Sequence, residues 1–457
     1  MIGKKHPDRY KYMTETPVPK LILQLAVPTI ISMLVTGIYN TADTYFVGRI
    51  SENATGATAA VGIVFPLMAI IQAFGFLFGH GSGNFLSRSL GAGKKKEASE
   101  MASTGFAMAL IFGLFIALFG NILMGPILDF LAPGDVTAST LSMTDEYARI
   151  ILIGAPFMMC QFVVNNQLRF QGSALYAMIG LLAGALINIV LDPLLILVLD
   201  MRVMGAAIAT VAGQICSFFI LLIGSRRGEN IKLKISSVKI NGYYFGQIIN
   251  GGIPSLFRQG LAAVASMLLN HEAGKFGGEP VIAGMTIVTR ITMLIASVVI
   301  GFGQGYQPVC SFNYGAKLKE RVKEGYWFCL KWAAVFLFAA GVLCFIFAPD
   351  IVRLFRKDPA VVDVGSVALR YQTVVLPFMS IIFISNMMLQ SIGKGFKASI
   401  TSSARNGIFF IPAILILPAL FGIRGVEMTQ PVADILTICV TIPFAASELR
   451  KMKNEEA

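Results

Sequence analysis

Four polar side chains lie in segments of the chain that are otherwise apolar. Asp43 is part of GIYNTADTYFVGR, Asp192 is part of INIVLDPLL, and Thr210 is part of GAAIAT. Asn188 precedes Asp192 by four residues, a spacing that places both side chains on one face of a helix. Carboxylate, amide and hydroxyl oxygens are hard ligands that suit a cation such as Na⁺, and neighbouring carboxyls can share a proton. The four residues predict a cation or proton site; the alternative is that both acids lie near helix ends and reach water.

The elements that carry these residues are predicted to be membrane-spanning helices. Of the 457 residues, 55% are hydrophobic and only 14% are charged, whereas an average soluble domain is about 25% charged. Runs of about 20 apolar residues, enough to cross a bilayer, occur twelve times. Their approximate ranges are 21–48, 57–85, 99–126, 146–169, 174–199, 204–225, 243–270, 280–304, 325–348, 368–391, 398–420 and 425–447. The composition excludes a soluble protein and predicts an all-α membrane protein with twelve transmembrane helices.

Basic residues in the connecting segments predict the topology. With a cytoplasmic N-terminus, the segments on the inner side carry 25 Lys and Arg residues and those on the outer side carry 7. Such a bias is typical of multi-pass proteins of the cell (inner or plasma) membrane, and it predicts that both termini are cytoplasmic. The net charge of +12 is therefore explained by topology and not by nucleic-acid binding. The first twenty residues are polar and basic, and the apolar run after them is too long for a signal-peptide core and has no small-residue cleavage site. The N-terminus is therefore expected to remain on the protein.

Two parts of the chain resemble each other. GHGSGNFLSRSLGAGKKKEA from Gly79 aligns with GQGYQPVCSFNYGAKLKERV from Gly303, and LRFQGSALYA from Leu168 aligns with LQSIGKGFKA from Leu389. The two alignments have nearly the same offset, which indicates a duplication. It predicts two pseudo-symmetric six-helix bundles with a cavity between them. The expected division is an N-lobe at 1–225, a cytoplasmic linker at 226–242 and a C-lobe at 243–457.

The duplication and the topology place the polar residues at a common depth. The helices that carry Asp43 and Asp192 both run from the inside to the outside, so both acids are expected in the outer half of the membrane, and Thr210 enters at a similar level. Pro28 lies half a membrane below Asp43 and removes a backbone hydrogen bond. It is interpreted either as a fixed kink or as a point where the first helix bends during a conformational change.

Charged residues also occur inside helices of the second half. Arg258, Gln259 and Arg290 lie in the middle of two helices, and Glu427 and Asp434 are seven residues apart on another. Charges in a bilayer need a partner or water. One interpretation is a fixed Arg290–Asp434 or Arg258–acid pair that holds the bundle together. The other is a site for a cationic substrate at Glu427 or Asp434.

Enzymatic and metal-binding motifs are not evident. The six cysteines have no CxxC or zinc spacing, and His6, His80 and His271 lie far apart. The sequence GHGSG lacks the GK[ST] ending of a phosphate-binding loop, so close helix packing explains its glycines better. We expect no cofactor and no enzymatic activity; an intramembrane enzyme would be the alternative from a different functional class.

Taken in order, these segments resemble the multidrug and toxic compound extrusion (MATE) transporters, and among them a bacterial MepA-like branch. The matching segments are NTADTYFVGR, SRSLGAGKKKEA, LRFQGS, NIVLDP, GAAIAT, GIPSLFRQG, GFGQGYQPVCSFNYGAKLKERV and GVEMTQPVAD. The resemblance covers nearly the whole chain. It implies a V-shaped pair of six-helix bundles of the MOP type and export of cationic, amphiphilic compounds in exchange for H⁺ or Na⁺ by alternating access.

The resemblance also implies roles for individual residues. A cation site in the N-lobe would use Asp43, Asn188, Asp192 and Thr210, with possible Na⁺ binding there. The family further implicates a Tyr and an Asn that correspond to Tyr147 and Asn166. Some relatives carry a functional acid where this chain has Arg258 and Gln259, which favours the N-lobe as the coupling site.

The resemblance leaves alternatives and partners to be tested. A flippase of a lipid-linked precursor shares this helical architecture, but it typically needs a strongly basic cavity, whereas this chain combines Arg258 and Arg290 with several acids. A passive channel would fit the number of helices but not the duplication. The expected partners are small-molecule organic cations and membrane lipids, and a self-contained two-lobed carrier is expected to be a monomer.

Overall fold

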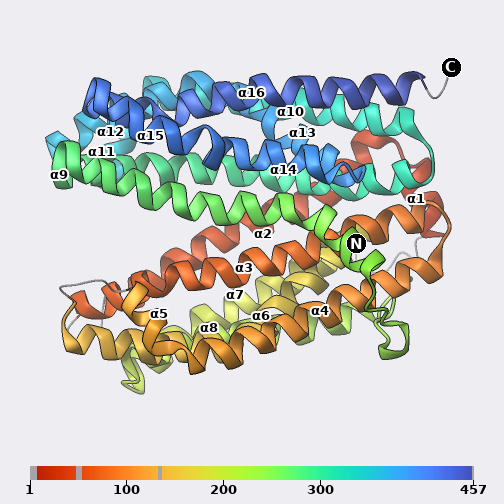
Figure 1. Cartoon of the computed structure of the whole chain (residues 1–457), viewed down its shortest axis with the longest axis horizontal. Helices are drawn as coiled ribbons and strands as arrows, with labels where there is room; N and C mark the ends of the chain where they lie inside the picture. The colour runs from red at the N-terminus through yellow and green to blue at the C-terminus, as the bar shows by residue number, and fades with distance from the viewer. Residues whose placement is uncertain (1–7, 48–53, 132–135, 455–457) are drawn as a thin grey trace. The chain divides into compact units, whose positions relative to one another are not determined.

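The computed structural model describes residues 8–47, 54–131 and 136–454 (Figure 1). The side chains of residues 38–45, 54 and 55 are not among those described. Almost all of these residues are helical. The helices are α1 (Arg9–Glu15), α2 (Val18–Val47), α3 (Ala54–Gly91), α4 (Lys95–Ile122), α5 (Met124–Leu131), α6 (Ala138–Phe170), α7 (Ala174–Pro193), η1 (Leu194–Val198), α8 (Arg202–Ser225), η2 (Ile235–Ser237), α9 (Gly242–Gly315), α10 (Lys319–Ile346), α11 (Ala348–Phe355), α12 (Pro359–Val375), η3 (Leu376–Phe378), α13 (Met379–Ser391), α14 (Gly395–Ser403), η4 (Ala404–Ile408), α15 (Phe410–Phe421) and α16 (Ile423–Asn454).

The helices account for the twelve predicted membrane spans. Within the described ranges, 11 helical segments are long and apolar enough to cross a membrane, and one of them is the 74-residue α9. A straight helix of 74 residues would be about 110 Å long at 1.5 Å per residue, several times the thickness of a bilayer core. Gly278 breaks it with a left-handed φ of 64°, a value that glycine adopts without strain. Counted as two spans on either side of Gly278, α9 brings the total to twelve and confirms the expected fold class.

The described residues form two compact units. One comprises Ile31–Gly252, and the other comprises the described parts of Met1–Ile30 and Ile253–Ala457. Two helices, α2 and α9, therefore contribute to both units. In α2 the boundary falls two residues after Pro28, and in α9 it falls two residues before Pro254. Proline removes one hydrogen bond from the backbone of a helix. Both helices therefore pass from one unit to the other next to a position where their backbone hydrogen bonding is interrupted.

The duplication predicted from the sequence is confirmed by side-chain contacts. Asn165 Nδ2 donates to the carbonyl oxygen of Ala177 at 3.0 Å, and Asn386 Nδ2 donates to the carbonyl oxygen of Ala398 at 2.7 Å. The alignment of Leu168 with Leu389 matches both members of the second pair with those of the first. Each bond joins the helix that ends at the repeated LRFQGS or LQSIGK segment to the helix that follows. The two halves thus share their internal hydrogen bonds as well as their helix pattern.

Glycines create close contacts in both units, as expected for GHGSG. A methyl group built on Gly81 of α3 would overlap the carbonyl of Ile248, near the start of α9. One built on Gly305 of α9 would overlap the backbone of Ala26 of α2. The two glycines are a matched pair of the repeat. In membranes, where helices associate largely by packing, small residues permit this approach of backbones.

We expect Gly252→Ala to lower the stability of the folded protein by about 1–3 kcal/mol, because the added methyl would overlap the carbonyl oxygen of Leu77. Gly246, six residues earlier on the same helix, has open space around it. Gly246→Ala is the matched control and is expected to be stabilising by about 0.5–1 kcal/mol, since alanine favours the helix. Thermal unfolding of the detergent-purified variants measures both. Equal effects of the two substitutions would contradict the close contact.

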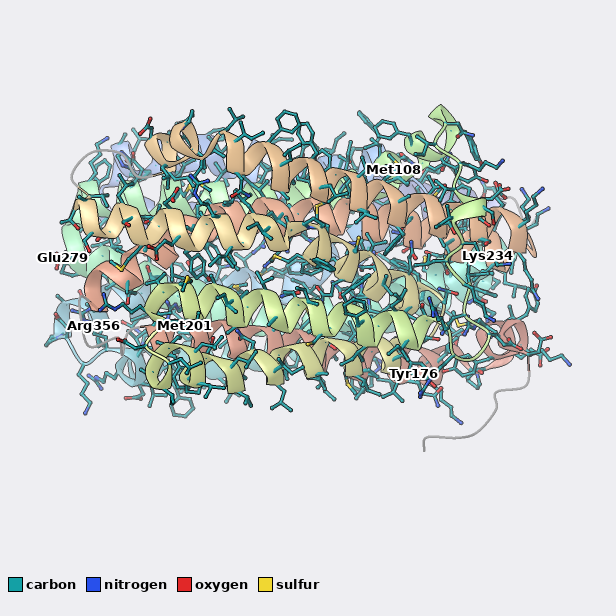
Figure 2. The ribbon with its side chains drawn as sticks, turned by 90° about the horizontal axis from the view of Figure 1, so that it is seen from below. Met108, Tyr176, Met201, Lys234, Glu279 and Arg356 are labelled. Carbon is teal, nitrogen blue, oxygen red and sulfur yellow. The ribbon has the colours of Figure 1, made fainter. Side chains whose placement is uncertain are left out.

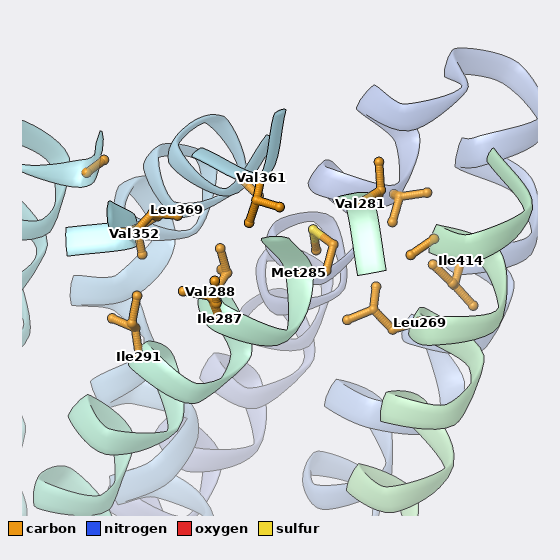
Figure 3. Packing of buried hydrophobic residues seen from close by; sticks show 14 of the residues in the cluster. Leu269, Val281, Met285, Ile287, Val288, Ile291, Val352, Val361, Leu369 and Ile414 are labelled. Atoms are coloured by element: carbon orange, nitrogen blue, oxygen red, sulfur yellow. The ribbon is translucent and has the colours of Figure 1, made fainter. Parts of the chain in front are cut away.

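The apolar core of the second unit gathers around the second half of α9. Met285, Val288 and Ile291 face Val352 of α11 and Val361 of α12 (Figure 3). These residues are at most 7% exposed. The β-branched and long side chains of these three helices interdigitate. Because closely packed side chains tolerate little displacement, this packing fixes the rotation of the three helices relative to one another.

The linker between the halves packs on the end of the first unit. Figure 2 places Lys234 of the linker and Tyr176 of α7 towards one end of this unit, and Met201, between η1 and α8, towards the other. The backbone nitrogen of Lys234 donates to Ser103 Oγ at 3.1 Å, and that of Lys239 donates to Thr104 Oγ1 at 2.9 Å. Two side chains of α4 thereby fix the backbone of the linker.

Candidate ion-coupling site

Asn188 and Asp192 are buried together on α7. Their side chains are 3% and 0% exposed. Asn188 Nδ2 donates to Asp192 Oδ1 over 3.4 Å, as the four-residue spacing predicts. A carboxyl group at this depth requires a cation, a proton or hydrogen-bond donors to offset its desolvation.

A small cavity of about 40 Å³ is lined by Asn188, whereas Asp192, its hydrogen-bond partner, is not among the lining residues. Helices α2, α6, α7 and α8 all contribute to it. Its lining residues are Thr36, Gln161, Phe162, Leu181, Gly184, Ala185, Asn188, Thr210, Gly213, Gln214 and Ser217. A cavity of this size accommodates a cation or a few water molecules, because one water occupies at least about 10–15 Å³ on this measure.

Amide oxygens dominate the polar lining of the cavity. The side-chain oxygens of Gln161, Asn188 and Gln214 are buried, and none accepts a hydrogen bond from the described residues. The amide nitrogen of Gln161 donates to Ser217 Oγ at 3.1 Å, which fixes the side chain. Buried acceptors without donors are costly, so three around one cavity beside Asp192 form an oxygen-rich environment that a cation or a bound proton would satisfy. Within the described ranges, no group of three His, Cys, Asp or Glu side chains is arranged for a metal.

The structure brings some of the predicted site residues together and separates others. Thr210, 5% exposed, lines the cavity with Asn188. Tyr147 is fully buried and its hydroxyl contacts Met68 Sδ at 4.0 Å. Asn166 is 1% exposed, and its Nδ2 donates to the carbonyl oxygen of Phe162 at 2.7 Å. Neither Tyr147 nor Asn166 lines the cavity.

Two further predicted residues lie on α2. Pro28 is half-buried inside the helix, close to the boundary between the units. The backbone of Asp43 belongs to the helix as well, but its side chain lies outside the described part of the structure. The participation of Asp43 in the site remains a prediction.

Gln161, Gln214, Thr36 and Ser217 were missed by the sequence analysis. Each is an uncharged polar residue inside an apolar run, and such residues are common in membrane helices because they bond to the backbone or to each other. The signal that could have identified Gln161 and Gln214 is the pair of amides in QFVV and GQIC, on the helices before and after the one that carries Asp192.

In the second unit, Asp434 is neutralised by Arg405, which was not among the predicted site residues. Asp434 is fully buried and accepts from Arg405 Nε at 2.8 Å. Gln372 and Gln430 also donate to it, at 3.1 and 3.0 Å. The expected partner, Arg290, is exposed. The fixed ion pair is therefore present with Arg405 in place of Arg290.

Arg405 lies inside the predicted span 398–420. In the structure this part of the span is the π-helical turn η4, between α14 and α15. Its guanidinium is 5.3 Å from the ring centre of Phe383. A π-turn inside a helix is often found at functional or strained positions, and here it presents the guanidinium to Asp434.

The remaining candidates of the second half do not converge on one site. Glu427 is buried and pairs with Arg424 at 3.4 Å. Arg258 donates to Ser255 Oγ at 3.5 Å, and Gln259 is partly exposed.

The chain has twelve apolar spans in two duplicated halves, and an oxygen-lined cavity lies among α2, α6, α7 and α8. These features define a multi-pass membrane transporter and not an enzyme. The chain belongs to the MatE family, whose model matches residues 28–194 and again residues 254–416. The double match independently reproduces the internal duplication.

Similar proteins agree with this assignment. The chain is 28% identical to the multidrug export protein MepA of Staphylococcus haemolyticus over 429 residues, which cover 94% of this chain and 93% of that protein. It is 27% identical to MepA of Staphylococcus aureus strain MRSA252 over 430 residues, 94% of each chain.

Solved structures share the fold as well. The crystal structure of MATE in the bent conformation superposes with a TM-score of 0.90 at 26% identity and 99% coverage of both chains. A MOP superfamily transporter from Pyrococcus furiosus, described as having a binding pocket of reverse polarity, superposes with a TM-score of 0.89 at 26% identity, covering 98% of this chain and 100% of that one.

Proposed function

We propose that the protein is a secondary active multidrug efflux antiporter, which exports cationic amphiphilic compounds in exchange for H⁺ or Na⁺. Membership of the MatE family and similarity to MepA multidrug export proteins support the transport of drugs. The observation that carries ion coupling is the oxygen-lined cavity beside Asp192, where three buried amide oxygens accept no hydrogen bond from described residues.

In the proposed cycle, the coupling ion binds at Asn188, Asp192 and Thr210, with Asp43 as a further ligand, in the state from which the drug leaves. The ion is released towards the cytoplasm in the opposite state, and the carboxylates then favour binding of the next cation. Exchange requires that ion and drug prefer opposite states, because a ligand shifts a conformational equilibrium only through its differential affinity.

The bend that connects the two states is proposed to form at Pro28. Support comes from the position of Pro28 beside the residue at which α2 passes from one unit to the other. Tyr147 and Asn166 are proposed to support the site from α6. They are buried there without contributing to the cavity lining.

The second half is proposed to contribute to recognition of the organic cation. Its two buried acids differ in how readily they could bind a substrate cation. Asp434 accepts three hydrogen bonds from described residues, whereas the described ion-pair partner of Glu427 is Arg424, which is exposed. We therefore infer that Glu427 is the better candidate for a substrate contact, whereas Asp434 stabilises the bundle. Arg258, Gln259 and Arg290 would limit which cations are accepted.

Further proposals concern the topology, the lipid contacts and the oligomeric state of the protein. The excess of basic residues on alternate connections supports cytoplasmic N- and C-termini and a location in the cell membrane. The two lobes are proposed to be divided at the linker 226–242. An apolar groove of about 750 Å³ between α4, α6 and α8, lined among others by Leu114, Leu118 and Phe157, supports contact with lipid acyl chains. The duplicated halves provide a complete carrier within one chain, which supports a monomer.

Ethidium efflux from proteoliposomes tests the proposed function. A Na⁺ gradient or a pH gradient is imposed alone, and we expect one of them to drive efflux against the ethidium gradient. The gradient that succeeds identifies the coupling ion. Absence of efflux under both gradients, with correctly reconstituted protein, would contradict drug antiport and favour a lipid or metabolite carrier; translocation of a fluorescent lipid in the same vesicles would then test a flippase.

A further inference from the structure

A buried histidine and arginine face each other between α3 and α6. His80 is 0% exposed and Arg169 is 5% exposed. Arg169 Nη2 lies 3.3 Å from His80 Nε2. A guanidinium can only donate hydrogen bonds. In a hydrogen bond between them Nε2 is the acceptor, the role it has in the neutral imidazole with its proton on Nδ1.

The duplicated half carries uncharged residues at the two matched positions. The alignment of Gly79 with Gly303 matches His80 with Gln304, and the alignment of Leu168 with Leu389 matches Arg169 with Gln390. The described side-chain bonds of Gln390 are neutral: it accepts from Gln307 at 3.0 Å and donates to Ser255 at 2.8 Å. The position matched with Arg169 is thus held by amide and hydroxyl partners, whereas Arg169 itself lies against an imidazole.

A third member of the cluster follows the same pattern. Asn166 accepts a hydrogen bond from Arg169, and Asn166 corresponds to Met387 in the other half. A methyl group on Gly79 would contact Asn166, and one on the matched Gly303 would contact Met387. The matched glycines therefore lie against matched positions in both halves, although the polarity of the side chains differs.

Polar residues on α6 lead from the proposed ion site to this pair. Gln161, Asn165 and Arg169 follow one another at intervals of four residues, so they share a face of the helix. Gln161 lines the cavity beside Asp192. Arg169 lies eight residues further along, about 12 Å at the rise of an α-helix.

The described surroundings of His80 combine aromatic rings with one charged side chain. The rings of Phe76 and Phe170 lie 5.3 and 6.0 Å from the imidazole. Arg169 of α6 is the charged group in contact with it.

Other titratable groups on the helices around His80 include Arg88 on α3, Glu97 and Glu100 on α4, and Tyr243 and Tyr244 on α9. The Tyr243 hydroxyl donates a hydrogen bond to Glu97, and the Tyr244 hydroxyl donates one to Glu100. The Arg88 guanidinium lies over the Phe85 ring.

We propose that His80 is a proton-carrying residue of the transport cycle and that Arg169 is its positioning residue. A proton that leaves the Asp192 site binds to the Nε2 lone pair, which breaks the N–H···N bond from Arg169 and forms an imidazolium. Loss of this proton to water on the linker side restores the neutral imidazole and the bond. Histidine suits this step because its charge ordinarily changes between about pH 5 and 8. The inference rests on the proposed antiport, with H⁺ as the coupling ion.

Nitrogen NMR tests the protonation of His80 without requiring transport. Replacing the other two histidines, His6 and His271, by Gln leaves a single ¹⁵N-labelled imidazole in the full chain. We expect the Nδ1–H tautomer near pH 8 and conversion to the doubly protonated ring as the pH falls to 5. An imidazole whose signals do not change over this range would overturn the proposal.

The pH profile of transport tests the role in the cycle. At a fixed pH difference of one unit, lowering the pH on the linker side from 7.5 to 5.5 should slow wild-type efflux, because a smaller fraction of His80 is then neutral and able to accept the next proton. His80→Gln, which introduces the residue of the matched position, should abolish this dependence. Gln304→Asn is the matched control and should retain it, and Arg169→Gln should shift it.

The outcomes separate the two proposals. An unchanged pH profile in His80→Gln would overturn the role of His80 while leaving antiport intact. Absence of efflux in the wild type would contradict the antiport itself, and the NMR titration would still decide whether His80 changes its protonation state. If His80→Gln does not fold, His80→Asn and the NMR experiment provide the test.

Discussion

Asparagine in place of Asp192 is expected to abolish ion-gradient-driven efflux, with a fall of at least about tenfold in initial rate, the equivalent of about 1.4 kcal/mol. Asp192 is fully buried and bonded to Asn188, beside a cavity lined by amide oxygens. The substitution keeps the shape of the side chain but removes its negative charge and its ability to bind a proton. Ethidium efflux from proteoliposomes under the effective gradient, together with ion-dependent quenching of intrinsic fluorescence, measures the loss.

The control for this experiment lies eight residues further along the chain. Asp200 is exposed and follows η1, outside the helices, in a left-handed conformation with φ 49° that asparagine also adopts. Asp200→Asn should retain wild-type efflux. Full coupling in Asp192→Asn would exclude Asp192 as the coupling residue, and an equal loss in both variants would point to a general effect of charge.

Methionine in place of Arg405 is expected to lower the stability of the protein by about 3–5 kcal/mol, because it leaves the carboxylate of Asp434 buried without its cation. Gln372 and Gln430 remain as donors, but amides do not neutralise the charge. Thermal unfolding in detergent, followed by loss of the monodisperse peak in size-exclusion chromatography, measures the change.

Two variants show whether the unpaired charge is the cause. Combining Arg405→Met with Asp434→Leu removes both charges and should recover most of the lost stability. Arg353→Met disrupts an ion pair with Asp350 in which both side chains are more than 60% exposed, and it should cost no more than about 1 kcal/mol. A double variant as unstable as Arg405→Met would contradict the explanation.

The fold could be predicted largely from the sequence because membrane spans depend on local composition. Apolar runs of about 20 residues set the helices, and the offset between Gly79 and Gly303 reveals the duplication without knowledge of any contact. The Asn188–Asp192 bond was equally accessible, since a four-residue spacing fixes neighbours on a helix. Each of these inferences uses only the sequence of one segment, or a comparison of the sequences of two segments.

The remainder of the site depends on contacts between segments. Gln161 and Gln214 reach one cavity from α6 and α8, and no spacing within either segment indicates that. Arg405 falls within the predicted span 398–420, but the sequence does not indicate which acid it pairs with. Its π-helical turn and its acid, 29 residues away, become apparent only when the helices are packed.

The order of synthesis gives the contacts of the first helices a particular consequence. Asn313 donates to the carbonyl oxygen of Met13 and Arg321 to that of Thr16, and Gly305 lies against Ala26. A ribosome completes α1 and the first part of α2 long before their partners on α9 and α10 exist. These early segments must therefore wait in the membrane or at its surface, without their native neighbours, until α9 and α10 have been inserted. An insertase or another membrane chaperone would be most useful to this protein during that interval.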